Sequence, residues 1–183
     1  MLQPNFSPFP ELKTERLLLR EIYENDLNEI LFLRSDKEIL KYLDKDPATV
    51  EQTVEFIKTI REYVKNNESI LWGITLPENN KVIGTICFWN ITKQHYRAEI
   101  GYILHTQFQG KGIMHEAMIA VLDYGFNVMK LHSVEANVNP QNIASAKVLE
   151  RNNFIREGYF KENYYHNGVF TDSAIYSLLT PLQ

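Results

Sequence analysis

Residues 105–112, His-Thr-Gln-Phe-Gln-Gly-Lys-Gly, stand between a segment that favours a strand and one that favours a helix. The strand is expected over Arg97 to Leu104, and the helix begins near Ile113 with apolar residues recurring along one face. Gly110 and Gly112 lack a Cβ, so backbone N–H groups around them can close on an anion. The N-terminus of the helix adds its dipole and free amides, which suits a phosphate or pyrophosphate.

Several common motifs do not fit the chain. A dinucleotide-binding pattern requires a third glycine where His115 stands, and a P-loop requires Ser or Thr in place of Gly112. His115-Glu116 begins a zinc-protease motif, but Ile119 occupies the place of its second histidine, so no metal is expected. Serine hydrolysis is disfavoured because the Gly-x-Ser-x-Gly elbow is missing.

The rest of the chain predicts a mixed sheet with helices. Strands are expected over residues 16–22, 70–76, 82–91, 132–138, 154–164 and 170–179. Helices are expected after a cap at Asn25, over residues 39–43, over 49–66 behind a capping box of Thr49 and Gln52, and over 142–152 with Ala144, Val148 and Leu149 turned inward. Helices interrupt the strands too rarely for a doubly wound fold, so the fold class is α/β of the α+β type.

The composition is that of an ordinary globular chain. Its 183 residues are 44% hydrophobic and 23% charged, and no repeat or Gly/Ser-rich linker divides them, so a single domain over residues 1–183 is expected. The formal net charge of −4 argues against nucleic-acid binding through phosphate neutralisation. The first ten residues lack a signal-peptide pattern, and the longest apolar run is Ala117 to Leu122, so we expect a cytoplasmic protein without a membrane span. The lone Cys87 is expected in the core.

Gln107-x-x-Gly110-x-Gly112 resembles the pyrophosphate-binding signature of the GNAT acetyltransferase superfamily. Asn142-x-x-Ser145 resembles the start of its second signature, which ends here near Phe154. Further segments resemble the branch that contains ribosomal-protein alanine N-acetyltransferases, namely residues 14–20, 99–102, 157–158 and 168–179. The resemblance therefore covers nearly the whole chain in the right order.

This resemblance implies a mixed, mostly antiparallel, V-shaped sheet with helices on both faces, whose fourth and fifth strands splay apart around the co-substrate acetyl-CoA. The implied binding residues are Ile103, Leu104, Gln107, Phe108, Gln109, Gly110, Lys111, Gly112, Ile113, Asn142 and Lys147. Main-chain amides from Phe108 to Ile113 would hold the pyrophosphate, Ile103 and Leu104 would pair with the pantetheine amides, and Asn142 would bond the pantetheine arm. For Lys111 and Lys147, a solvated surface charge is the alternative to a phosphate contact.

The resemblance also bears on the group that meets the thiolate leaving coenzyme A. Many members of the superfamily place a tyrosine seven residues after the motif asparagine, where this chain has Leu149. In the ribosomal-protein branch a serine three residues after the asparagine is the proposed donor, and Ser145 holds that position. A hydroxyl would act as a hydrogen-bond donor that stabilises developing charge. The alternative for Ser145 is a packing role.

Glu99 is the leading candidate for the base that takes the amine proton. Strand alternation turns it to the same face as Arg97, Gly101 and Ile103 at the border of the expected cleft. The alternative is a strand carboxylate that is exposed or paired with Arg97. His105 is a further candidate, and Glu162 lies near the position of Tyr164, where some relatives carry an acidic residue.

The acceptor is expected to be an amine-bearing peptide, protein or small molecule. An α-amine with a pKa of about 7.8 is about 14% neutral at pH 7, whereas a lysine at about 10.4 is neutral in roughly one molecule in 2,500. Weak evidence for a strong base therefore favours a protein or peptide N-terminus. A polyamine, an amino acid or an antibiotic remains open as acceptor, as does a catalytically idle acyl-CoA-binding protein, and the sequence leaves the oligomeric state open.

Overall fold

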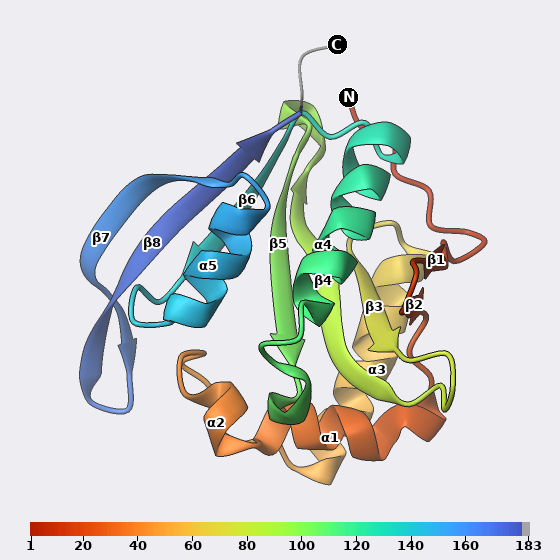
Figure 1. The fold of residues 1–183 in the computed structure, drawn as a ribbon, viewed down its shortest axis with the longest axis horizontal. Coiled ribbons are helices and arrows are strands. Elements are labelled where there is room, and N and C mark those ends of the chain that lie inside the picture. Colours follow the sequence, from red (N-terminus) through yellow and green to blue (C-terminus); the bar gives the residue numbers. More distant parts are fainter. Residues whose placement is uncertain (181–183) are drawn as a thin grey trace.

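One eight-stranded sheet organises the structure, a computed structural model that describes residues 1–180 (Figure 1). The strands, in their order across the sheet, are β1 (Leu12–Lys13), β2 (Leu18–Arg20), β3 (Ile70–Thr75), β4 (Val82–Thr92), β5 (Arg97–Leu104), β6 (Ser133–Val138), β8 (Val169–Leu179) and β7 (Ile155–His166). Neighbouring strands are antiparallel except for the parallel pair β5 and β6. The predicted mixed, mostly antiparallel sheet is confirmed.

The sheet opens between β5 and β6. Their register pairs Arg97 with Ser133 and ends where Glu99 meets Glu135, although β5 continues to Leu104. Beyond that point β5 pairs with β4 alone, and Figure 1 shows β5 and β6 diverging. The predicted splay of two central strands is confirmed, and it leaves unpaired backbone on the inner edges of both strands.

The helices cover both faces of the sheet, as predicted. The α-helices are α1 (Leu27–Ser35), α2 (Lys37–Leu40), α3 (Val50–Lys65), α4 (Ile113–Asp123) and α5 (Ile143–Arg151), with short 3-10 turns over Glu24–Asp26, Lys93–His95 and Thr106–Phe108 and a π-helical turn over Tyr124–Val128. In Figure 1, α4 and α5 lie in front of the sheet and α3 lies behind it. None of these helices is both long and apolar enough to cross a membrane in the described residues 1–180.

Two apolar clusters hold these layers together. The larger joins α4 to the sheet through fully buried Trp72, Phe88 and Met118. The smaller joins α1 and α3 through Ile30 and Ile57. Burial of each large apolar side chain contributes about 1.5–3 kcal/mol to the free energy of folding, so the clusters hold in place the strands that border the opening.

The N-terminal region differs from the sequence prediction. The expected strand over residues 16–22 is shorter, and the two-residue strand β1 was not predicted. Asn25 does not cap a helix, because the chain first makes the 3-10 turn in which Asp26 accepts from the Tyr23 amide (2.9 Å). Asp26 is also buried against Arg20 at 2.8 Å, and this ion pair fixes the turn.

Two further helix boundaries show how local caps act. The helix expected over residues 39–43 lies earlier, at Lys37–Leu40, because the Asp36 side chain accepts from the amides of Glu38 and Ile39. The capping box that begins α3 is confirmed: Thr49 Oγ1 accepts from the Gln52 amide at 3.3 Å, and Gln52 Oε1 accepts from the Thr49 amide at 2.9 Å.

Candidate functional site

The glycine segment forms the connection from β5 to α4. Gly110 and Gly112 have φ of +73° and +76°, in the left-handed region that favours glycine. A Cβ on Gly110 would meet no atom within 4 Å, so open space lies beside that backbone. The amides of Phe108 and Gln109 donate within the turn, to the carbonyls of His105 (2.9 Å) and Thr106 (3.2 Å). The amides from Gly110 to Ile113 are therefore the ones in the best position to meet an anion.

An arginine that the sequence analysis did not single out stands beside this segment. Arg16 pairs with Glu116 in the first turn of α4 at 2.6 Å and donates to the Lys111 carbonyl at 3.1 Å. Its guanidinium lies 3.5 Å from where a Cβ of Gly112 would be. Burial acts to raise the pKa of Glu116, but hydrogen bonds from Thr14 and Arg16 outweigh it and lower the pKa. This clamp holds the start of α4 and places a guanidinium near the loop, with its charge offset by the Glu116 carboxylate.

The end of β5 borders the opening. The Ile103 carbonyl is turned toward β4, since it lies 2.7 Å from where a Cβ of Gly84 would be. Backbone groups alternate along a strand, so those of Tyr102 and Leu104 face the opening instead. The Leu104 carbonyl accepts from the Gln109 side chain at 3.0 Å. Of the two residues predicted to pair with pantetheine, Leu104 therefore has the better orientation.

Helix α5 places the second predicted group of residues on the far side of the opening. Asn142 caps the helix, and its Oδ1 accepts from the Ser145 amide at 3.0 Å. Lys147 is exposed, and so is Ala144, which was wrongly expected to face inward. Leu149, in the place of the missing tyrosine, is fully buried, so its position belongs to the core.

Ser145 contacts a tyrosine whose role the sequence analysis missed. The Tyr102 hydroxyl lies 2.8 Å from Ser145 Oγ and 3.3 Å from the Ser145 carbonyl oxygen. Burial raises the pKa of Tyr102, so the phenol keeps its proton. When Tyr102 donates to Ser145 Oγ, the serine proton is free to point elsewhere. The signal in the sequence was the alternation of β5, which turns Tyr102 to the face opposite Glu99.

Glu99 is half-buried on that other face. Burial raises its pKa, and the neighbouring Glu135 carboxylate raises it further, against a hydrogen bond from Asn90 (3.0 Å) and the charge of Arg97. Arg97 forms its ion pair with Glu135, so the alternative of a Glu99 carboxylate paired with Arg97 is wrong. Glu99 thus remains a carboxylate with raised basicity beside the opening.

The other two candidate bases have different surroundings. His105 is stacked on Phe32, with ring centroids 4.4 Å apart, and its Nδ1 accepts from the Gln107 amide at 3.2 Å. Glu162 is exposed on β7, and its amide donates to Asp172 at 2.8 Å. His105 is therefore held by contacts within the turn before the glycines, and Glu162 lies on the outermost strand of the sheet.

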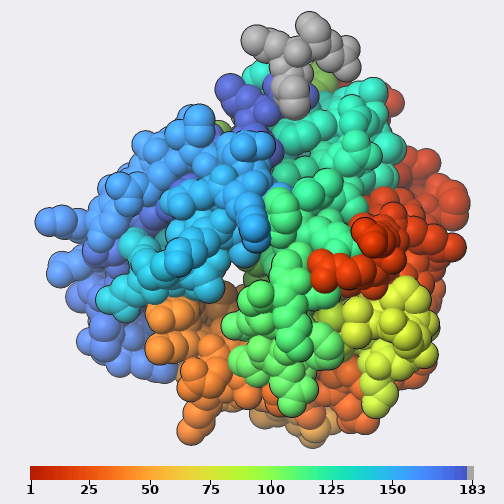
Figure 2. Space-filling view, in the orientation of Figure 1, coloured from red at the N-terminus to blue at the C-terminus, as the bar shows by residue number. Residues whose placement is uncertain are grey.

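The sheet opening has chemically different groups on its two faces. Ser145 and Tyr102 lie on the side of α4 and α5, and Glu99 lies on the opposite side. Figure 2 shows a small hole through the molecule between the blue helix α5, the orange α2 region and the green segment after β5. An acyl donor held at this opening would meet hydrogen-bond donors on one face and a carboxylate on the other.

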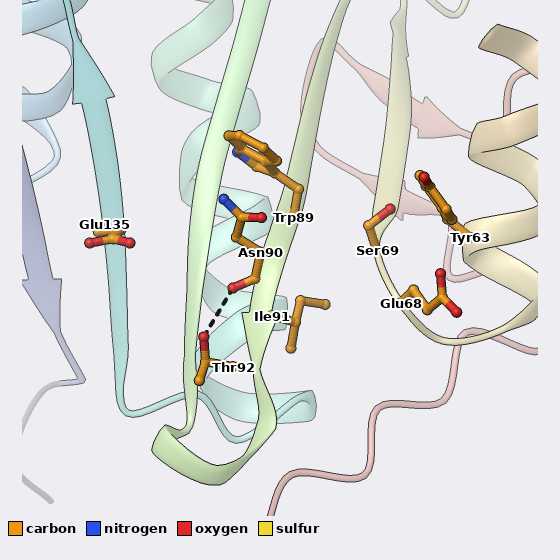
Figure 3. A pocket seen from close by; sticks show the side chains of 8 residues that line it. All are labelled: Tyr63, Glu68, Ser69, Trp89, Asn90, Ile91, Thr92 and Glu135. Atoms are coloured by element: carbon orange, nitrogen blue, oxygen red, sulfur yellow. Dashed lines mark hydrogen bonds between the residues drawn. The ribbon is translucent and has the colours of Figure 1, made fainter. Parts of the chain in front are cut away.

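The Glu99 face continues into a cavity of about 780 Å³. Its lining residues, shown in Figure 3, are Tyr63, Glu68, Ser69, Trp89, Asn90, Ile91, Thr92 and Glu135. Trp89 is the cross-strand partner of Glu99, and Glu99 is the partner of Glu135, so the three side chains share one face. Cys87, two residues before Trp89 on β4, is half-buried, and burial raises the pKa of its thiol to about 12.

Comparisons with known proteins agree with this geometry. Residues 16–155 match the family model described as an acetyltransferase (GNAT) domain. An uncharacterized N-acetyltransferase of Bacillus subtilis is 33% identical over 94% of this chain and 98% of its own length. The crystal structure of the ribosomal-protein-S5-alanine acetyltransferase of Vibrio fischeri is 29% identical, covers 93% of this chain and 96% of that one, and has a TM-score of 0.83. A spermidine N(1)-acetyltransferase of Vibrio cholerae is 26% identical over 86% of this chain and 89% of its own length.

Proposed function

Because this chain belongs to the GNAT acetyltransferase family and is an acetyl-CoA-dependent N-acetyltransferase, we propose that its acceptor is the N-terminal α-amine of a protein or peptide. The observation that carries the proposal is the surroundings of Glu99, a half-buried carboxylate at the sheet opening whose pKa is raised by burial and by the neighbouring Glu135. The likeness to an S5-alanine acetyltransferase supports it. Relatives suggest two types of acceptor: a ribosomal protein, from the S5-alanine acetyltransferase, and a polyamine, from the spermidine acetyltransferase.

Acetyl transfer requires the amine nitrogen to lose a proton while it attacks the thioester carbonyl. In our proposal Glu99 accepts that proton, directly or through one water, as the C–N bond forms. Its raised pKa makes it a better base than an ordinary glutamate. An α-amine needs this help less than a lysine does, because its pKa is lower by about 2.6 units, or about 3.5 kcal/mol. A carboxylate of this kind therefore suits an α-amine.

The C–S bond breaks on the opposite face, where sulfur leaves as a thiolate. Ser145 is proposed to donate a hydrogen bond to this sulfur, and Tyr102 to hold Ser145 Oγ in place by donating to it at 2.8 Å. A hydroxyl does not protonate a thiolate outright, so the sulfur takes its final proton from water. Stabilisation of the developing charge by one such donor is the role that oxyanion-hole groups play.

The glycine loop is proposed to bind the pyrophosphate of acetyl-CoA. The amides from Gly110 to Ile113, the N-terminus of α4 and the guanidinium N–H groups of Arg16 beside Gly112 support this role. Leu104 would then lie along the pantetheine arm, with Asn142 across the opening. The side chains of Lys111 and Lys147 are exposed at the outside of this path, and each contributes at most a charge screened by solvent.

The test measures release of free thiol from acetyl-CoA with three acceptors. The first is a peptide with a free N-terminal alanine, the second is its N-acetylated counterpart that carries a lysine, and the third is spermidine. The proposal expects kcat/KM to be at least tenfold higher with the free N-terminus than with either of the others. Faster turnover of the blocked lysine peptide would overturn it, and faster turnover of spermidine would establish the second candidate, a polyamine acetyltransferase, which the Vibrio cholerae relative favours.

A further inference from the structure

The cavity beside Glu99 combines aromatic and acidic side chains. The exposed fractions of Tyr63 and Trp89 are both 44%, which is high for such large rings. Figure 3 shows Trp89 on β4 between Glu135 on β6 and, on the other side, Tyr63 of α3 and Glu68 in the turn after α3. Two of the eight lining residues are carboxylates, and none of the eight is basic. A space of this kind fits a cation with an alkyl or planar stem.

A glycine in the neighbouring strand lies beside Trp89 and Cys87. A Cβ on Gly101 would lie 3.7 Å from Trp89 Nε1 and 3.2 Å from Cys87 Sγ. The distance to the indole is an ordinary van der Waals contact, and the distance to Cys87 is tight. Gly101 therefore lies directly against Cys87 and beside the indole, which stays 44% exposed.

One basic side chain of the protein lies at the edge of this cavity, that of Arg97. The Arg97 guanidinium pairs with Glu135, whose side chain is 29% exposed. Glu68 is exposed at the opposite edge and takes part in no ion pair among residues 1–180. With Glu99 at the border, three carboxylates stand against Arg97 and Lys45, whose charge acts on the Cys87 thiol of the same face. The carboxylates still outnumber the cations, so this face is electronegative.

We propose that this cavity selects acceptors with a second positive charge, and that it binds the Lys or Arg side chain at the second residue of an N-terminal peptide. This inference rests on the proposed function, because Glu99 marks where the reacting amine lies. The cavity begins one strand from Glu99, and neighbouring strands lie about 4.8 Å apart. The next residue of an extended peptide is about 3.4 Å farther along, so its long side chain would extend over the Trp89 ring into the space that Tyr63 also lines.

The experiment compares three peptides that differ only in their second residue: Ala-Arg-Tyr-Ala, Ala-Ala-Tyr-Ala and Ala-Glu-Tyr-Ala, each amidated at its C-terminus. Affinity is measured by calorimetry in the presence of coenzyme A, and turnover by thiol release with acetyl-CoA. We expect KM and Kd to be about 5- to 30-fold lower for the arginine peptide than for the alanine peptide, with the glutamate peptide weakest. Equal values for the arginine and alanine peptides would overturn the inference and leave the proposed function intact.

Variants assign the preference to the cavity. Glu68→Gln and Trp89→Leu should each reduce the ratio of arginine-peptide to alanine-peptide kcat/KM by about 2- to 10-fold. Trp89→Phe keeps an aromatic ring, so its ratio should lie between those of Trp89→Leu and the wild type. The matched control is Glu55→Gln, which removes a charge from the same helix α3 about 12 Å before Tyr63 and should leave the ratio unchanged. A ratio that Glu68→Gln and Trp89→Leu leave at the wild-type value would overturn the assignment.

Spermidine distinguishes the proposed N-terminal acceptor from the proposed selection of a second positive charge. If the enzyme acetylates spermidine and accepts neither the alanine peptide nor the arginine peptide, the proposal of an N-terminal acceptor is overturned. If the KM for spermidine then rose in Glu68→Gln and not in Glu55→Gln, the selection of a second positive charge would still hold. An unchanged KM for spermidine in both variants would contradict that selection as well.

Discussion

Replacing Tyr102 by phenylalanine tests whether this phenol acts through Ser145. The change removes the hydroxyl that lies 2.8 Å from Ser145 Oγ and leaves the ring in place. The net value of such a hydrogen bond is about 1 kcal/mol, which corresponds to about fivefold in rate. We expect Tyr102→Phe to lower kcat about 3- to 10-fold, and Ser145→Ala to lower it about 10- to 1,000-fold, the range of one weak or well-placed charge-stabilising donor.

The double variant gives the decisive comparison. If Tyr102 acts only by orienting Ser145, the double variant is as slow as Ser145→Ala alone, because the removed serine has nothing left to be oriented. The assay is thiol release with saturating acetyl-CoA and peptide, with acetyl-CoA affinity measured separately by calorimetry. A double variant slower by the product of the two single effects would refute the coupling.

A matched control keeps packing effects apart from this coupling. Tyr176 is also a buried tyrosine, and its hydroxyl contacts Glu150 of α5 at 3.4 Å. Tyr176→Phe therefore removes a similar group beneath the same helix without touching Ser145. We expect near wild-type kcat in this variant, and a loss equal to that of Tyr102→Phe would assign the effect to helix packing.

Three further predictions concern binding, stability and reactivity. Gly110→Asp should abolish measurable acetyl-CoA binding by calorimetry in a folded protein, whereas Gly168→Asp, a control at φ +83° with equally open surroundings, should bind normally; wild-type affinity in Gly110→Asp would contradict the loop assignment. Asp26→Ala should lower the free energy of unfolding in urea by about 3–5 kcal/mol, since it leaves Arg20 buried without its partner, and a loss below about 1 kcal/mol would contradict this. Cys87, with a pKa of about 12, should react with a thiol reagent at pH 8 only after unfolding, because about one thiol in 10,000 is ionised; rapid reaction of the folded protein would show that burial does not protect it.

Features that depend on residues close together in the chain could be predicted from the sequence. The glycine loop lies between a strand with the predicted bounds, Arg97–Leu104, and a helix that begins at Ile113, as expected. Thr49 and Gln52 form the predicted capping box, because a cap involves residues only three apart. Asn25 shows the limit of such reasoning: it is a good capping residue, but the ion pair between Arg20 and Asp26, six residues apart, fixes a different turn.

Contacts between distant residues were not predictable in the same way. Arg97 stands two residues from Glu99, yet it pairs with Glu135, 38 residues later, because β6 is the parallel neighbour of β5. Tyr102 and Ser145 meet across 43 residues for a similar reason, since α5 packs over the face to which Tyr102 points. Such pairs require the order of strands in the sheet, and single-sequence periodicity specifies only which face a residue takes.

The pH dependence of a Glu99→Gln variant tests the central claim, that Glu99 takes the proton of an N-terminal α-amine. The substitution keeps the shape and removes the proton acceptor. The raised pKa of Glu99 means that its carboxylate is lost as the pH falls through that raised value and is present above it. An α-amine is mostly protonated at pH 6 and mostly neutral at pH 9, so the base matters most on the acid side.

The measurement is kcat/KM from pH 6 to 9 for the wild type, Glu99→Gln and the exposed control Glu55→Gln, on a peptide with a free N-terminal alanine. We predict that Glu99→Gln is slower by at least tenfold at pH 6, recovers in part toward pH 9, and that Glu55→Gln follows the wild type throughout. Profiles of Glu99→Gln and wild type that run parallel over the whole range would contradict the account.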